Sequence, residues 1–110
     1  MAREALGLLQ GTVDVLILKT LSGRPLHGYA VAELIRQRSE GDLTVEDAAL
    51  YQALHRLERK GFVESEWGTT DGNRRARFYS ITADGRKQLR TNVAELRRYV
   101  SALFRVLEPA

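Results

Sequence analysis

The residues best able to do chemistry lie on one predicted helix, residues 44–60. The side of this helix opposite its apolar stripe carries hydrogen-bonding side chains at helical spacing: Tyr51, Gln52, His55, Arg56 and Arg59. Gln can form two hydrogen bonds with adenine, and Arg can do so with guanine or with phosphate. The pattern is therefore typical of a helix that reads DNA bases, although an ordinary solvated helix face has the same composition.

A basic hairpin is predicted directly after this helix. The stretch FVESEW alternates, ARFYSI is rich in β-branched and aromatic residues, and the loop GTTDGNRR between them holds an Asp-Gly turn signal. We expect Trp67, at the end of the first strand, to lie in the core. The basic end of the hairpin is placed to contact the DNA backbone or minor groove, through Asn73, Arg74, Arg75 and Arg77. Because this basic hairpin follows the polar helix directly, DNA binding becomes the stronger interpretation of that helix.

The elements that must position these residues follow from apolar periodicity and turn signals. Three helices, near residues 6 or 12 to 21, 26 to 41 and 44 to 60, are followed by two strands near 62 to 67 and 76 to 81, and by a last helix near 82 to 107. Thr44 is expected to cap the third helix and Thr82 the last. The order predicts a mainly α fold with a small β-hairpin (α+β). We interpret residues 1–82 as a winged helix-turn-helix DNA-binding domain and 83–110 as a C-terminal dimerisation helix.

Two of the predicted helices carry apolar residues beyond what one small core needs. The first helix has Val15 and Leu18 on the side opposite its main apolar stripe, which indicates burial on both sides. One side can face its own domain, so we expect Val15 and Leu18 to face a partner in the dimer. The last helix has apolar residues spaced 4, 3, 4, 3 and 4 apart, namely Leu89, Val93, Leu96, Val100, Leu103 and Leu107. This seam is too short for a stable coiled coil alone but suits a dimerisation arm. The alternative is a helix folded back on its own domain.

Composition excludes several other classes. The 110-residue chain has no cysteine, which excludes disulfides, thiolate zinc sites and cysteine nucleophiles. The two histidines belong to no cluster with metal-ligand spacing, and no phosphate-loop pattern is present. We therefore expect no enzyme activity, no cofactor and no metal. Without a signal-peptide pattern or an apolar run long enough to span a bilayer, we expect a cytoplasmic protein.

Charge is distributed unevenly along the chain. Residues 1–71 hold 8 Lys and Arg against 11 Asp and Glu, whereas residues 72–110 hold 9 against 3. Net charge therefore changes from −3 in the first part to +6 in the second. Arg outnumbers Lys by 14 to 3, and only Arg has the forked geometry that matches phosphate and guanine. This bias agrees with a nucleic-acid partner, although a solvated surface has similar charges.

Three stretches resemble the PadR family of transcriptional regulators over nearly the whole chain: GTVDVLILKTLSGRPLHGYAVAELIRQRS, LYQALHRLERKGFVESEW and NRRARFYSITADGRKQL. The single short C-terminal helix is similar to the compact branch of that family. The resemblance implies a homodimeric DNA-binding regulator, usually a repressor released by a small molecule. It implies dimerisation through the first and last helices. It also implies a major-groove helix at 47–60, which adds Lys60, a wing at 68–75, and a phosphate contact near His27, Gly28 and Tyr29.

The chain departs from the family pattern at two positions of the third helix. Gln52 stands where proline is common, and Ala49 stands where the family has Ser or Thr. Both changes point to a different operator sequence. The last helix also lacks the tryptophans with which some multidrug-sensing relatives stack their ligands. By analogy we still expect a small apolar or aromatic effector between the first and last helices, lined by Leu8, Val15, Leu96, Tyr99 and Val100.

The sequence thus predicts a sequence-specific DNA-binding transcriptional regulator, acting as a ligand-responsive repressor and a homodimer on double-stranded DNA. The alternative is a winged-helix protein-interaction module that does not bind DNA specifically, with its last helix docking on a different protein.

Overall fold

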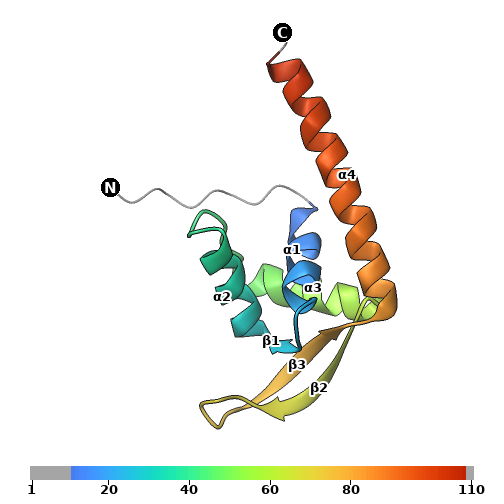
Figure 1. Ribbon diagram of the computed structural model, residues 1–110. Coiled ribbons are helices and arrows are strands. Elements are labelled where there is room, and N and C mark those ends of the chain that lie inside the picture. Colours follow the sequence, from blue (N-terminus) through green and yellow to red (C-terminus); the bar gives the residue numbers. More distant parts are fainter. Residues whose placement is uncertain (1–10, 109–110) are drawn as a thin grey trace.

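The computed structural model describes residues 11–108 (Figure 1). Its elements are α1 (Thr12–Leu21), β1 (Leu26–His27), α2 (Gly28–Arg38), α3 (Asp47–Arg59), β2 (Val63–Thr69), β3 (Arg75–Ile81) and α4 (Ala83–Leu107). Helices α1 to α3 pack together, the sheet extends from one end of them, and α4 projects from the body (Figure 1). The predicted winged helix-turn-helix class is confirmed.

The core forms where α1 meets α2, α3 and the base of the sheet. The predicted stripe of α3 is buried, and its Leu54 has no exposed surface. Ile17 and Leu18, which are neighbours on α1, are also 0% exposed. The two-sided burial predicted for α1 is therefore present within one chain. Leu18, which was expected to face a partner, offers no surface to one because its own helices cover it. Val15, at 8% exposed, is covered nearly as well.

Helix α3 begins later than the sequence predicts. Thr44 was expected to cap it, but the cap position is Glu46, whose side chain makes no capping hydrogen bond. Val45, between these two residues, is 8% exposed and belongs to the core. Glu46 has extended dihedral angles (φ −70°, ψ 149°). Inserting Val45 into the core keeps the chain extended past Thr44, so the first helical turn starts at Asp47.

The hairpin is confirmed, but it belongs to a three-stranded antiparallel sheet in the order β1-β3-β2. The added strand pairs Leu26 with Tyr79 and His27 with Phe78. With only two residues, β1 has too little alternation to be recognised in the sequence. Asn73 has the left-handed conformation of the hairpin turn, with φ 60°. The sheet therefore joins the start of α2 directly to the wing, which is the β2–β3 hairpin, residues 63–81.

Helix α4 begins where predicted. The Thr82 hydroxyl accepts from the Gly85 amide at 3.0 Å and donates to the Gly61 carbonyl at 2.7 Å. A Cβ at position 85 would lie 2.1 Å from the Phe62 carbonyl oxygen, so only glycine lets α4 approach the wing this closely. Leu89 and, in part, Val93 pack on the core, and the C-terminal half of the helix runs away from the body (Figure 1). Among the described residues, no helix is long and apolar enough to cross a membrane.

Candidate nucleic-acid interface

The outer face of α3 is polar and open to solvent. With 100° between successive residues, Gln52, His55 and Arg59 lie opposite the buried stripe of the helix. All three are exposed, as is Lys60 at the C-terminal cap. Gln52 and Arg59 offer the amide and guanidinium groups suited to base edges, and His55 adds an imidazole between them. These predicted residues therefore share one accessible surface.

Arg56 lies on a flank of α3 and is engaged within the protein. Its Nη2 is 2.5 Å from Asp14 Oδ1, and its Nε donates to Asp14 Oδ2 at 3.4 Å. The side chain retains 41% exposure, and that of Asp14 22%. This forked pair uses the donors that would otherwise meet a guanine. The sequence contained no signal for Asp14 as the partner, because it lies on α1, 42 residues away.

Tyr51 lies on the other flank and contacts the start of α2. A Cβ at Gly28 would come within 2.7 Å of the Tyr51 hydroxyl oxygen, so this glycine lets the phenol lie against the helix end. His27 caps α2, with Nδ1 accepting from the Ala30 amide at 3.3 Å. The ring of Tyr29 stacks near His27 and is 72% exposed. The residues that the family resemblance places near phosphate therefore adjoin α3.

The wing presents its arginines in two different ways. Asn73 and Arg74 are exposed at the turn. Arg75 and Arg77 lie over the ring of Trp67, with their guanidinium carbons 4.8 and 5.8 Å from the ring centroid. Trp67 is 58% exposed, so its predicted place in the core was wrong. The reason is that β2 leaves the core after Val63, and Trp67 pairs across the sheet with Arg77 in the projecting part.

A groove of about 690 Å³ joins these parts. It is lined by the start of α2, by one residue of α3 and by the wing: His27, Gly28, Tyr29, Tyr51, Thr70, Asp71, Gly72, Arg74, Arg75, Ala76 and Arg77. Three positive charges against one negative charge make its wall basic. The sequence predicted most of these residues as DNA contacts, but only the fold shows that they surround one concave surface next to the outer face of α3.

Tyr79 marks the root of the wing. Its side chain is 2% exposed, and burial raises the pKa of its phenol above the ordinary value, with nearby Arg77 acting in the opposite direction. The phenol is therefore neutral at any pH used for DNA binding. Beyond this root, β2 and β3 have mostly exposed side chains, so the wing extends from the body with little packing of its own.

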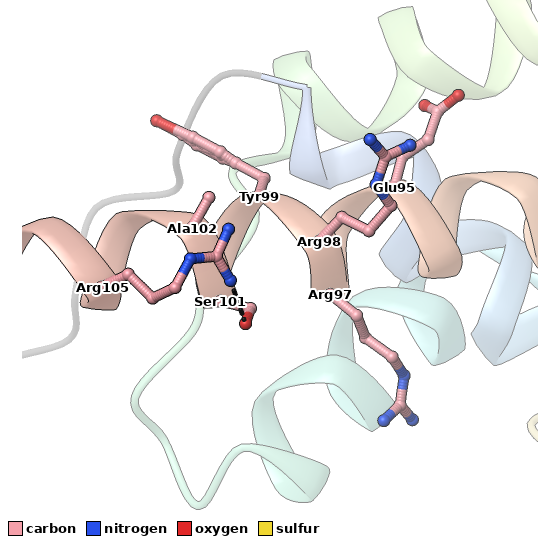
Figure 2. A pocket seen from close by; sticks show the side chains of 7 residues that line it. All are labelled: Glu95, Arg97, Arg98, Tyr99, Ser101, Ala102 and Arg105. Carbon is pink, nitrogen blue, oxygen red and sulfur yellow. Dashed lines mark hydrogen bonds between the residues drawn. The ribbon is translucent and has the colours of Figure 1, made fainter.

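Helix α4 has an apolar stripe in the half that leaves the body. The predicted seam residues in this half are Leu96, Val100, Leu103 and Leu107, between 37% and 60% exposed. Figure 2 shows a shallow concave surface elsewhere on α4, with Arg97 pointing away from Arg98 and Glu95. The Arg105 guanidinium there donates to Ser101 Oγ at 3.2 Å (Figure 2). The seven residues that line it all come from this one helix, so it encloses nothing and has the character of a charged outer face.

A second groove, of about 400 Å³, lies between α1 and α4. It contains three of the residues predicted to bind an effector: Val15, Leu96 and Tyr99. Val100 lines a separate hollow further round α4, and Leu8 lies outside the described residues. The groove is more polar than predicted, because its wall also includes Asp14, Gln88, Asn92 and Glu95. Over residues 11–108, no group of three or more histidine or carboxylate side chains is placed to hold a metal ion.

Comparisons with known proteins agree with this geometry. The model of the transcriptional regulator PadR-like family matches residues 17–91. A solved transcriptional regulator from Clostridium thermocellum is 28% identical, with 86% of this chain and 91% of that chain covered and a TM-score of 0.78. A PadR family transcriptional regulator from Eggerthella lenta DSM 2243 is 27% identical, with 92% and 86% covered and a TM-score of 0.78.

Two further proteins are similar to this chain over most of its length. A PadR family transcription regulator from Clostridium difficile R20291 is 27% identical, with 88% and 98% covered and a TM-score of 0.72. A curated protein of Lysinibacillus sphaericus, described as uncharacterized protein X, is 27% identical over 88 residues, 80% of this chain and 81% of its own length. With its winged helix-turn-helix fold and its basic wing beside an open polar helix, the chain belongs to the PadR-like family of DNA-binding transcriptional regulators.

Proposed function

We propose that this protein is a homodimeric repressor that reads a specific DNA sequence and responds to a small molecule. The observation that carries the proposal is the outer face of α3. Gln52, His55 and Arg59 are exposed there together, beside the basic groove formed by the α2 start and the wing. A helix with this surface suits the major groove, and the exposed tip of the wing suits the backbone beside it. Since its proposed partner is chromosomal DNA, the protein would act in the cytoplasm.

The exposed apolar stripe of α4 supports the dimer. Four seam residues at heptad spacing stay partly exposed on a helix that leaves its own domain. Pairing the stripe with that of a second copy buries this surface, and closed two-fold symmetry is the commonest outcome of such pairing. The two α3 helices would then reach half-sites about one DNA turn, roughly 34 Å, apart. Repression follows if such a site overlaps a promoter.

The groove between α1 and α4 supports the response to an effector. Val15, Leu96 and Tyr99 provide apolar and aromatic contacts, and the groove lies beside the proposed dimer stripe. Asp14 lines the same groove and pairs with Arg56 of the reading helix. A bound molecule that moved α1 or competed for Asp14 would therefore alter the placement of α3. Its effect on DNA affinity is limited by its difference in affinity for the two arrangements.

A binding titration tests this proposal. The purified protein is titrated against labelled DNA from just upstream of its own gene and against a scrambled duplex, each at two salt concentrations. We expect tighter binding to the upstream duplex and a steep loss of affinity with salt. Screening small aromatic molecules against the complex then tests the effector. Molecules that bind the α1–α4 groove without changing DNA affinity would contradict the proposed switch.

A further inference from the structure

Three side chains link the reading helix to the wing. Ser65 of β2 donates to Glu58 Oε2 of α3 at 2.6 Å, and Arg77 Nε of β3 donates to Ser65 Oγ at 2.8 Å. Arg77 Nη2 also lies 3.6 Å from the same carboxylate oxygen. Arg77 is 44% exposed and Glu58 29%, so solvent screens the ion pair only in part. The sequence pattern marked Arg77 as a DNA contact and left Glu58 and Ser65 without a role.

The wing has few other attachments along its length. Its root is in the core through Val63 and Tyr79, and β1 pairs with β3 only at Tyr79 and Phe78, where the His27 ring also meets that of Phe78 edge-on. The side chains beyond are mostly exposed. Arg77 also packs against Trp67, its partner in the sheet register. Glu58, Ser65 and Arg77 therefore form a side-chain contact between α3 and the hairpin, on the part of β2 and β3 just beyond the strand pairing with β1.

We propose that Glu58, Ser65 and Arg77 form a brace that sets the angle between the wing and α3, and that Arg77 is a positioning residue for DNA binding. A wing held in place before binding avoids the ordering cost that a free hairpin meets on the DNA. Arg77 acts through Glu58 and Ser65, while Arg74 at the tip is left to contact phosphate. The inference rests on the proposed contact between the wing and DNA.

The brace and simple electrostatics predict opposite changes in DNA affinity when the charge of Glu58 is removed. Glu58 is an acidic residue on the reading helix, so removing its charge should strengthen attraction to phosphate. If it holds the wing, its removal should instead weaken binding. Glu66 provides the matched control, because it carries the same charge on the same strand as Ser65, is exposed, and points to the opposite face of the hairpin. Ser65→Ala tests the brace without any change of charge.

The experiment measures affinity for a duplex that the wild type enriches from a random library, at two salt concentrations. We expect Glu58→Ala to bind about fivefold more weakly, the loss typical of a partly exposed network of charged hydrogen bonds. Ser65→Ala should also bind more weakly with an unchanged salt slope, because no charge is lost. Glu66→Ala should bind as tightly as the wild type or more tightly. Circular dichroism and urea unfolding confirm that each variant is folded.

Trp67 gives an independent readout in the free protein. It is the only tryptophan of the chain and lies against Arg77. Quenching of its fluorescence by acrylamide should increase in Glu58→Ala and Ser65→Ala and stay unchanged in Glu66→Ala. Tight binding by Glu58→Ala, or unchanged quenching in both brace variants, overturns the brace. If the wild type enriches no sequence, the proposed function fails instead, and the quenching comparison still decides whether the brace holds the wing.

Discussion

The proposed dimer can be weakened at Leu103, in the middle of the exposed stripe of α4. Leu103 is 40% exposed in the single chain. Full burial of a leucine side chain contributes about 1.5–3 kcal/mol, so burying the remaining two fifths contributes about 1 kcal/mol. Two-fold symmetry doubles this to about 2 kcal/mol, or roughly a 30-fold change in the dimer dissociation constant. Leu103→Gln should weaken the dimer by at least this factor, because glutamine keeps the helix but adds a polar group.

Sedimentation equilibrium over a range of concentrations measures the change. Arg105→Gln is the matched control, since it introduces the same residue on the opposite side of α4, at an exposed position that contacts Ser101. The control should leave the dissociation constant unchanged. If Leu103→Gln dimerises as tightly as the wild type, the stripe is not the interface. If the wild type is itself a monomer at high concentration, the proposed dimer is wrong.

Three further predictions concern the junction, the wing and the reading helix. Gly85→Ala should lower the urea midpoint, because the new Cβ would lie 2.1 Å from the Phe62 carbonyl oxygen. That oxygen belongs to the backbone and cannot turn aside, so the overpacking cost of about 3 kcal/mol or more exceeds the gain in helix propensity of about 1 kcal/mol. An unchanged midpoint would contradict the close approach of α4. Arg74→Ala should weaken binding to all duplexes and lower the salt slope by about one, and an unchanged slope would remove Arg74 from the phosphate contacts. Arg59→Ala should reduce discrimination at one base pair of the site by about 1–3 kcal/mol. The assay measures affinity for four duplexes that differ only in that base pair. Equal losses of affinity for all four would make Arg59 a phosphate contact.

Much of the fold could be predicted because local signals and tertiary packing agree. The Thr82 cap, the buried stripe of α3 and the hairpin were all predicted from patterns within a few residues of one another. The start of α3 was wrong because the burial of Val45 is a tertiary effect that overrides a plausible local cap at Thr44. The strand β1 was missed because two residues have no measurable alternation.

At the candidate site, the sequence did not show which arginines are already bound within the protein. Residue type and spacing marked Arg56 and Arg77 as DNA contacts, but their partners lie on other elements. Asp14 on α1 binds Arg56, whereas Glu58 on α3 and Ser65 on β2 bind Arg77. Nothing in a single sequence distinguishes an arginine that is free for DNA from one that a distant carboxylate holds. Only the folded structure therefore separates arginines that are open to DNA from arginines that support the structure.

Sequence-specific DNA binding can be tested most directly by letting the wild-type protein select sequences from a random duplex library, at low and at moderate salt. We expect enrichment of an inverted repeat whose half-sites are centred about one helical turn, roughly 10 base pairs, apart, with affinity falling steeply as salt rises. Enrichment of no sequence, even at low salt, would contradict sequence-specific binding and favour a winged helix that serves a protein partner.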